Sequence, residues 1–321
     1  METLKIAVVG AGGMGTVHIS NYAFISGCKV TAVCDALETG RAKALEIGAA
    51  PYSDLGELLA NEDVDIVDVC TPSFLHYEQV LTALKAGRHV FCEKPAALNK
   101  TDAKEMFDLA REYGVRLFIG HVLQYAPETL VLRGLINNGE YGRPLDASFL
   151  RLSACPRWVK NGWLFDKAKS GLLPFDLHIH DLDLIVSLFG APETVSHTSC
   201  GNAGAGYKEH YRFLYGYKDL FIAAEAAWYN ADIPFTATWR VYFENAVVIN
   251  DGNGVTAYSF DHRPRVFDTE EKIKIPTGIN LPPTGIFLTE LTDFLEKTRQ
   301  GGAGCDREEE ILTVLGILEG I

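Results

Sequence analysis

Residues 4–15 read LKIAVVGAGGMG: an apolar run ends at Val9 and a glycine-rich run begins at Gly10. An unbroken apolar run is typical of a strand buried on both faces of a parallel sheet. The glycines fit G-x-G-x-x-G: Gly10 makes a tight turn, Gly12 lets the backbone approach a phosphate, and Gly15 lets a helix pack against the strand. The stretch predicts the first βα unit of a nucleotide-binding sheet. The alternative is a flexible turn.

Outward from this unit, short apolar runs alternate with helical patterns as far as about residue 121. The later apolar runs are Val30–Cys34, Val64–Cys70, His89–Cys92 and Val115–Ile119. The helical patterns are Met14–Ile25, Gly40–Ile47, Ser73–Ala86 and Asp102–Tyr113. Strands separated by helices indicate a parallel sheet. We predict an α/β Rossmann domain with a doubly wound parallel sheet over residues 1–121.

The alternation of apolar runs and helical patterns ends after His121. A helical pattern at Pro127–Asn137 precedes strand-like runs separated by Gly, Asn and Asp: Ala147–Leu152, Arg212–Tyr217, Leu220–Trp228, Thr236–Phe243 and Ala246–Asn250. Helical patterns recur at Leu172–Leu188, Thr284–Thr298 and Glu308–Gly320. We predict that residues 122–321 form an α+β domain with a large, mostly antiparallel open sheet. Because the last helical pattern stops abruptly at Ile321, we expect further C-terminal residues.

Composition narrows the function classes. With 47% hydrophobic and 22% charged residues the chain is typical of a globular protein, and its net charge of −13 disfavours a nucleic-acid partner. The seven cysteines form no C-x-x-C pair, which favours a reducing compartment over a disulfide framework or a zinc knuckle. The N-terminus lacks signal-peptide features and no run is long enough to span a membrane. We expect a cytoplasmic protein that binds small molecules and no metal.

Asp35 ends the second predicted strand, twenty residues after Gly15. A carboxylate there accepts hydrogen bonds from the adenosine ribose and repels a 2′-phosphate, so NAD is favoured over NADP. Arg41 lies close enough in sequence to keep NADP use open. The alternative role for Asp35 is to cap the next helix.

Two further motifs follow later strands: TPSFLH (Thr71–His76) and EKP (Glu93–Pro95). Both fall at carboxyl ends of parallel strands, where open α/β sheets bind ligands. Together with the glycine loop they resemble the Gfo/Idh/MocA oxidoreductases, named for glucose-fructose oxidoreductase and inositol dehydrogenase. AGRHVFCEKP (Ala86–Pro95) is close to that family's A-G-K-H-V-x-x-E-K-P, and GEYGRP (Gly139–Pro144) matches its G-x-x-G-x-P turn.

A third block, Gly171–Asp183, is similar to the family's G-G-x-x-x-D-x-G-x-H-x-x-D, with Asp176, His180 and Asp183 on the two acids and the histidine. The chain departs from the family pattern at three positions. His178 and Leu172 replace glycines, and Gln124 stands where arginine is common. We expect altered backbone geometry at the helix entrance and altered substrate contacts near Gln124.

The resemblance implies roles for residues across both halves. The residues implied to bind the cofactor are Gly10, Ala11, Gly12, Gly13, Met14, Gly15, Asp35, Arg41, Cys70, Thr71, Pro72, His76, Glu93 and Lys94. The residues implied to bind substrate are His121, Gln124, Arg151, Arg157, Trp163, Asp176 and His180. Trp163 could stack on a sugar face and the arginines could hold hydroxyls. The alternative is a core tryptophan with surface cations.

Oxidation of a secondary alcohol requires a base for the hydroxyl proton while the hydride leaves. His180 suits this role because an imidazole exchanges protons near neutral pH. Asp176 lies one helical turn earlier and can hold the ring or a substrate hydroxyl, while Lys94 donates a hydrogen bond to the reacting oxygen. A metal site at Asp176, His178, His180, Asp181 and Asp183 is disfavoured, because His178 points away from the Asp176/His180 face of a helix.

These residues predict an NAD-dependent dehydrogenase that acts on a monosaccharide, inositol or related polyol. Two alternatives stay open: an enzyme that recycles bound NAD through oxidation, elimination and re-reduction, and a ligand-sensing regulator without chemistry. A sensor has no need for Lys94, Asp176 and His180. Because the second sheet would leave a large apolar face in water, we also predict a homodimer or homotetramer.

Overall fold

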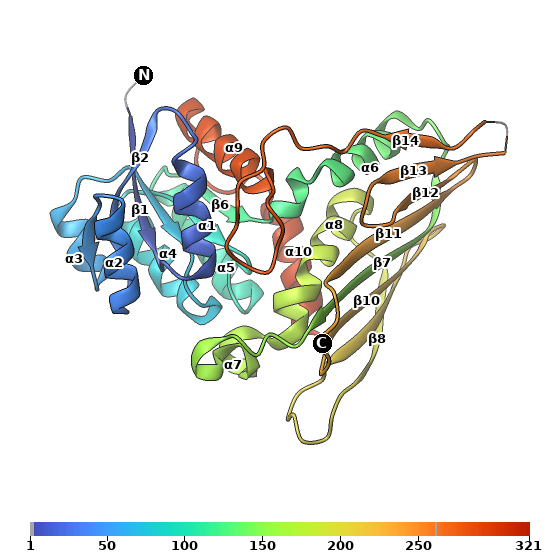
Figure 1. Ribbon diagram of the computed structural model, residues 1–321, viewed down its shortest axis with the longest axis horizontal. Helices are drawn as coiled ribbons and strands as arrows, with labels where there is room; N and C mark the ends of the chain where they lie inside the picture. The colour runs from blue at the N-terminus through green and yellow to red at the C-terminus, as the bar shows by residue number, and fades with distance from the viewer. Residues whose placement is uncertain (1–2, 261) are drawn as a thin grey trace. The chain divides into compact units, whose positions relative to one another are not determined.

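The computed structural model describes residues 3–260 and 262–321. They form two compact units (Figure 1). Unit 1 comprises Met1–Tyr125 and Glu271–Glu308, and unit 2 comprises Ala126–Glu270 and Glu309–Ile321. Within the described ranges, no helix is both long enough and apolar enough to cross a bilayer.

Unit 1 is built on a six-stranded sheet in the order β3-β2-β1-β4-β5-β6. All neighbouring strands pair in parallel. The strands are β1 (Leu4–Val9), β2 (Cys28–Cys34), β3 (Ala50–Tyr52), β4 (Ile66–Val69), β5 (His89–Glu93) and β6 (Leu117–Gly120). The predicted Rossmann sheet is confirmed. The three-residue β3 was not predicted, because its sequence APY carries no apolar run.

Helices separate these strands, and capping side chains start two of them. They are α1 (Gly13–Tyr22), α2 (Glu38–Glu46), α3 (Leu55–Asn61), η1 (Ser73–Leu75), α4 (His76–Lys85), α5 (Lys100–Glu112) and η2 (Val122–Tyr125). Asp54 accepts a hydrogen bond from the Glu57 amide at the start of α3, and Asn99 accepts one from Asp102 at the start of α5. Such caps satisfy amides that have no partner inside the helix. The sequence-based reading missed α3.

Unit 1 also contains a helix from far along the chain, α9 (Ile286–Gln300). Its buried Leu291, Phe294 and Leu295 join the core of Ile6 and Val8, and the ring centroid of Phe294 lies 5.4 Å from that of Phe91. The predicted division into residues 1–121 and 122–321 did not anticipate this return, because an amphipathic helix does not specify from sequence which sheet covers its apolar face.

Unit 2 contains an eight-stranded sheet in the order β14-β13-β12-β11-β7-β10-β9-β8. Its strands are β7 (Pro144–Ala154), β8 (Thr194–Cys200), β9 (His210–Gly216), β10 (Phe221–Tyr229), β11 (Thr236–Phe243), β12 (Val247–Asn250), β13 (Val255–Tyr258) and β14 (Arg265–Phe267). Only the β7/β10 pair is parallel among these neighbours. The expected large, mostly antiparallel sheet is confirmed.

Helices of unit 2 lie along one face of this sheet (Figure 1). The helices of unit 2 are α6 (Pro127–Asn138), η3 (Lys160–Phe165), α7 (Lys167–Ser170), the π-helical turn η4 (Pro174–His178), α8 (Ile179–Phe189) and α10 (Glu308–Glu319). Alternate residues of β9 are buried on the covered side, Tyr211, Phe213 and Tyr215, whereas Arg212 and Leu214 between them are exposed. This period of two is what a half-buried strand requires.

Candidate functional site

Five predicted site segments lie at one edge of the six-stranded sheet. Each begins directly after a strand: Gly10 after β1, Asp35 after β2, Cys70 after β4, Lys94 after β5 and His121 after β6. Because the strands are parallel, their carboxyl ends share one edge. The chain order reverses between β1 and β4, and ligands of open α/β sheets bind outside such a reversal.

The glycine loop has the shape of a phosphate cradle. A Cβ on Gly10, whose φ is +87°, would lie 2.8 Å from Thr71 Cγ2, and a Cβ on Gly15 would lie 1.8 Å from the Gly10 oxygen. Only glycine therefore fits at these two close approaches. A Cβ on Gly12 would meet nothing within 4 Å. The open space beside Gly12, at the start of α1, fits the pyrophosphate of a dinucleotide.

Asp35 braces this loop from the neighbouring strand. Its two carboxylate oxygens accept hydrogen bonds from the amides of Ala11 and Leu37, each at 2.7 Å. The bond to Leu37, just before α2, resembles the helix-capping role that was weighed as an alternative. The side chain is still partly exposed, and Arg41 is exposed on α2. The arrangement therefore leaves a carboxylate at the position expected for the adenosine ribose.

His76 is almost fully buried and ties two loops together. Its Nδ1 lies 2.8 Å from the carbonyl oxygen of Pro95 and its Nε2 lies 2.8 Å from that of Thr71. Burial lowers its pKa below the ordinary value. The contacts observed for His76 are structural, so a direct contact with a coenzyme stays a prediction. Thr71 and Pro72 beside it are partly exposed.

Glu93 and Lys94 form the turn after β5. Glu93 is buried, and its Oε2 accepts a hydrogen bond from the main-chain amide of Lys94 at 3.1 Å. Its other carboxylate oxygen, Oε1, lies 3.1 Å from Nε2 of His18. The Lys94 side chain is partly exposed. Glu93 therefore links the interior of unit 1 to the main chain of Lys94.

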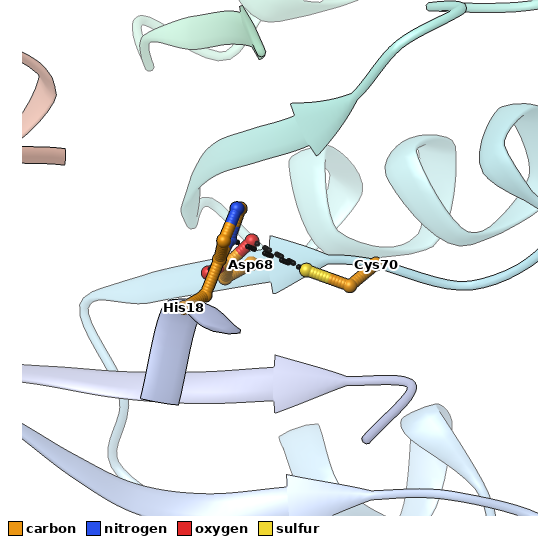
Figure 2. Close-up of side chains that lie close together, drawn as sticks. All are labelled: His18, Asp68 and Cys70. Atoms are coloured by element: carbon orange, nitrogen blue, oxygen red, sulfur yellow. Dashed lines mark hydrogen bonds and ion pairs between the residues drawn. The ribbon is translucent and has the colours of Figure 1, made fainter. Parts of the chain in front are cut away.

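A buried polar cluster that the sequence-based reading missed lies behind this turn: His18, Asp68, Cys70 and Glu93, called the His18 cluster below. His18 comes from α1, Asp68 from β4 and Cys70 from the residue after β4 (Figure 2). His18 Nδ1 lies 2.8 Å from Asp68 Oδ2. The Cys70 Sγ lies 3.3 Å both from that nitrogen and from Asp68 Oδ1. The sulfur thus points inward.

A sequence signal for this cluster was available. Asp68 is the one charged residue in the buried strand Ile66–Val69. A carboxylate that is buried among apolar neighbours needs a partner, and His18, three residues after Gly15, was the nearest basic candidate on α1.

Charge inside the His18 cluster is set by burial and by neighbours. Burial alone would lower the pKa of His18, but Asp68 and Cys70 outweigh it and hold this pKa well above the ordinary value. Burial would raise the pKa of Glu93, but His18 outweighs it, so the Glu93 pKa is lowered. Burial and Asp68 raise the pKa of Cys70. These shifts favour the imidazolium form of His18, the ionised form of Glu93 and the neutral thiol of Cys70.

In unit 2, Asp176 lies in η4 and His180 in α8. Both are partly exposed, whereas Leu177, His178 and Ile179 between them are buried. The acid and the histidine therefore share the less buried face, although the turn that joins them is partly π-helical. The sequence-based reading expected an ordinary α-helix there.

The entrance to this helix explains one departure from the family pattern. Leu172 has a φ of +62°, the left-handed conformation that glycine adopts most readily. Gly171 before it has a φ of +69°, and a Cβ there would lie 2.3 Å from the ring of Phe175. The backbone keeps the geometry of a glycine pair while a leucine fills the second position.

His178 explains the second departure. It is fully buried, its ring stacks on Phe213 with centroids 3.8 Å apart, and its Nε2 lies 2.6 Å from the hydroxyl of Tyr215. Burial, with a smaller effect of Arg151, lowers its pKa to about 3. His178 is therefore a neutral structural residue that anchors η4 to β9. This agrees with the prediction that it points away from the Asp176/His180 face.

Arg151 requires a correction. It was assigned to the substrate, but its guanidinium is buried and binds both oxygens of Asp181, at 2.9 and 2.7 Å. A buried bidentate ion pair fully matches the charge of the arginine. Arg151 fastens α8 to β7, so we no longer assign it to substrate binding.

The other residues assigned to the substrate lie in less buried or loop positions. Arg157 is exposed and bonds to Asn230. Trp163 in η3 and Gln124 in η2 are partly exposed, and His121 after β6 is buried. Their assignment stays a prediction.

Two family models match this chain. Residues 4–121 match an oxidoreductase family with an NAD-binding Rossmann fold, and residues 129–269 match the GFO/IDH/MocA C-terminal domain. The protein belongs to the Gfo/Idh/MocA family. Its N-terminal domain is accordingly an NAD-binding domain, which fits the open cradle at Gly12 and the carboxylate of Asp35.

Relatives of this Gfo/Idh/MocA protein include sugar-modifying enzymes. It is 36% identical over 60% of its length to D-glucoside 3-dehydrogenase of Escherichia coli and covers 56% of that enzyme. It is 35% identical over 64% of its length to 2,7-anhydro-N-acetylneuraminate hydratase of Mediterraneibacter gnavus and covers 55% of it. The matched region thus spans little more than half of these relatives.

Solved structures extend the fold likeness to the whole chain. The levoglucosan dehydrogenase complex with NADH and levoglucosan superposes with a TM-score of 0.85 at 19% identity, covering 100% of this chain and 96% of that one. This likeness establishes the fold of both units.

Proposed function

We propose that this protein is an NAD-dependent dehydrogenase that moves a hydride between the nicotinamide and a secondary alcohol carbon of a sugar, inositol or related polyol. The observation that carries the proposal is the position of Lys94, directly after β5 at the sheet edge where the glycine loop follows β1. A cation at that edge suits the oxygen of an alcohol undergoing oxidation.

Three side chains, His180, Lys94 and Asp176, are proposed to move or orient the proton of the substrate hydroxyl. NAD, when bound, accepts the hydride from the alcohol carbon. His180 takes the hydroxyl proton, because its side chain is partly exposed and histidine is the residue that most often serves as a general base. Lys94 donates a hydrogen bond to the same oxygen as it becomes a carbonyl, and Asp176 orients the imidazole or a neighbouring substrate hydroxyl. In the reverse direction His180 returns the proton.

The coenzyme contacts follow from the sheet edge. Gly10–Gly15 would hold the pyrophosphate and Asp35 the adenosine ribose. Thr71 and Pro72 follow the neighbouring strand β4 and would contact the coenzyme from there. A carboxylate at Asp35 favours NAD over NADP, with Arg41 the group that would accept a 2′-phosphate. Trp163 and Arg157 are proposed to contact the sugar, together with His121 and Gln124.

A second candidate is supported by the relative named as a hydratase. In this version NAD stays bound, the sugar is oxidised, a group is eliminated next to the new carbonyl, and the intermediate is reduced again. The same three side chains would serve, because each redox step needs a proton moved at the same oxygen.

We also propose that the protein is a homodimer or homotetramer through the open face of the unit 2 sheet. Large apolar side chains on that face are exposed, including Phe221 at 69%, Leu214 at 61% and Tyr242 at 44%. Exposed apolar patches of this kind mark association surfaces. Light scattering should show a dimer or tetramer at micromolar concentration, and a monomer would contradict the proposal.

The test of activity mixes purified protein with NAD and a panel of sugars, inositols and polyols. Nicotinamide absorbance and product mass are followed together. A change in absorbance with loss of two hydrogens from the substrate identifies a dehydrogenase, and a change in product mass at constant absorbance identifies the recycling enzyme. Binding of NAD and sugar without either change would identify a sensor. Lys94→Ala and His180→Ala are the control variants, each expected to lower kcat at least about 10²-fold.

A further inference from the structure

The His18 cluster places a fully buried imidazole between two carboxylates, an arrangement that apolar packing alone does not require. The His18 ring is fully buried and enclosed by aromatic side chains: it meets Phe91 edge-on with centroids 5.1 Å apart and Tyr22 with centroids 6.5 Å apart. Enclosed in this way, the ring has one orientation. Its two nitrogens then face carboxylates from two different strands, Asp68 of β4 and Glu93 of β5.

Each of the two carboxylates faces an N–H only if both ring nitrogens carry a proton. A neutral imidazole has one N–H and would turn a lone pair toward one of the two acids, whereas an imidazolium hydrogen-bonds through Nδ1 to Asp68 and forms an ion pair through Nε2 with Glu93 at 3.1 Å. The raised pKa of His18 agrees with this arrangement. His18 therefore acts as a charged bridge between two neighbouring strands.

The bridge continues to the main chain of Lys94. Glu93 uses one oxygen for His18 and the other for the Lys94 amide. A carboxylate suits both contacts because it shares its negative charge between two oxygens, whereas an amide of the same shape is neutral and has only one acceptor oxygen. The position of the Lys94 main chain thus depends on how Glu93 is held.

We propose that His18 is a positioning residue: held between Asp68 and Glu93, its ring fixes the Glu93 carboxylate and thereby the turn that carries Lys94. The proposal rests on the proposed function, in which Lys94 donates to the reacting oxygen. His18 itself acts only through Glu93 and does not touch the substrate.

A bound metal ion is the competing explanation of the same cluster. His18, Asp68 and Cys70 offer ligand atoms that all lie within 4.8 Å of one another. The imidazole and the carboxylate, however, are already 2.8 Å apart, a direct hydrogen-bond distance, and the proton between them supplies the positive charge. Metal analysis of the purified protein separates the two explanations.

The first test measures hydrogen exchange of the Lys94 amide in the full-length protein, by NMR, without any assay of activity. In His18→Gln the Glu93 carboxylate loses its anchor, so we expect exchange at Lys94 at least about 10-fold faster. Glu93→Gln should give the same result in a second variant that keeps the size of the side chain, because a neutral amide cannot form the ion pair with His18 that holds this side chain. The matched control is His89→Gln at the other end of β5, where His89 accepts a hydrogen bond from the Arg116 amide; exchange at Lys94 should stay within about 2-fold.

The second test titrates the nitrogens of the His18 ring by NMR. The groups that face the ring are Asp68 on β4, Cys70 after it, Glu93 on β5 and Tyr22 on α1, while Phe91 and Phe287 supply apolar contacts. We expect both nitrogens to carry protons at pH 8, and Glu93→Gln to lower the midpoint. A ring that is neutral at pH 7 would overturn the proposal, as would one equivalent of bound metal.

The kinetic test then separates positioning from a merely structural role. His18→Gln should lower kcat about 10²-fold while KM for the sugar and Kd for NAD stay within about 3-fold, since small misplacements of a catalytic group cost rates of this size. Wild-type kcat in His18→Gln, or equal exchange at Lys94 in the His18 and His89 variants, would overturn the proposal. If the wild-type protein oxidises no sugar, the proposed function fails, and the exchange and titration results still decide whether His18 positions Lys94.

Discussion

Two buried histidines, His18 in unit 1 and His178 in unit 2, differ in charge because their neighbours differ. Both are fully excluded from water. His18 lies between two carboxylates and its pKa is raised. His178 stacks on Phe213, bonds to the Tyr215 hydroxyl and lies near Arg151, and its pKa is lowered to about 3.

Burial acts on both rings in the same direction, against the charged form. What differs is the neighbours. In unit 1 two acids outweigh burial, and the charged ring links β4, β5 and the Lys94 turn. In unit 2 the His178 ring contacts Phe213 and Tyr215 and, within the described part of the chain, pairs with no acid, and the neutral ring anchors the turn that carries Asp176. The turn that carries Lys94 is thus held by the charged ring of His18, and the turn that carries Asp176 is held by the neutral ring of His178.

Removing the two rings should have unequal effects on stability. His18→Leu leaves Asp68 and Glu93 buried without a counter-charge, which we expect to lower the free energy of unfolding by about 3–5 kcal/mol. His178→Leu leaves only the Tyr215 hydroxyl without its partner, which we expect to lower the free energy of unfolding by about 1–3 kcal/mol. Urea unfolding at pH 7 measures both. A larger loss for His178→Leu than for His18→Leu would contradict the charge assignment.

The ion pair beside His178 tests the correction made for Arg151. Arg151→Met alone should lower the unfolding free energy by on the order of 3 kcal/mol, because Asp181 stays buried and charged. Adding Asp181→Leu should recover most of that loss. If Arg151 instead binds the sugar, the double variant would be stable but its KM would rise at least 10-fold, which would show the correction to be wrong.

The pH dependence of stability should have opposite signs in the two regions. For His178 the folded pKa is depressed, so stability present above about pH 6.5 is lost as the pH falls toward 3, by about 1.4 kcal/mol per pH unit at most. For His18 the folded pKa is raised, so stability present below about pH 6.5 is lost as the pH rises through the folded value.

Urea unfolding across pH in two variants isolates these contributions. His178→Phe should flatten the acid side of the profile, and His18→Gln should flatten the alkaline side. Equal profiles for wild type and His178→Phe between pH 6.5 and 4 would contradict the neutral assignment of that ring.

The smallest expected effect is at Leu172, at the entrance to the same helix. Leu172→Ala and Leu172→Gly lose the same buried contacts, but only glycine relieves the left-handed backbone at φ +62°. The glycine variant should therefore be the more stable of the two by about 1 kcal/mol, the reverse of the usual order within helices. Thermal unfolding with alanine equal to or above glycine would show that the backbone there is not strained.

The sequence predicted the parts of this fold that repeat regularly. The alternation of apolar runs and helical patterns predicted the parallel sheet, and the glycine spacing predicted the cradle, because local sterics determine both. The placement of α9 could not be predicted, because the sequence does not specify which of the two sheets the apolar side chains of this helix, such as Phe294, pack against.

The candidate site was predicted less completely than the fold. Motif positions fixed Lys94, Asp176 and His180 as candidates, but the buried pairing of Arg151 with Asp181 joins residues thirty positions apart. The His18 cluster joins residues fifty positions apart. Such pairings depend on tertiary packing, and only the buried charge of Asp68 within an apolar strand hinted at one of them.

The proposed chemistry is tested most directly by a crystal structure of the protein with NAD and a sugar or polyol that it oxidises slowly. We expect Lys94 Nζ and a ring nitrogen of His180 both to lie within roughly 2.6–3.2 Å of one substrate hydroxyl oxygen, beside the nicotinamide. If the two groups contact different parts of the ligand, or if the sugar binds away from the nicotinamide, the proposed dehydrogenase chemistry is contradicted.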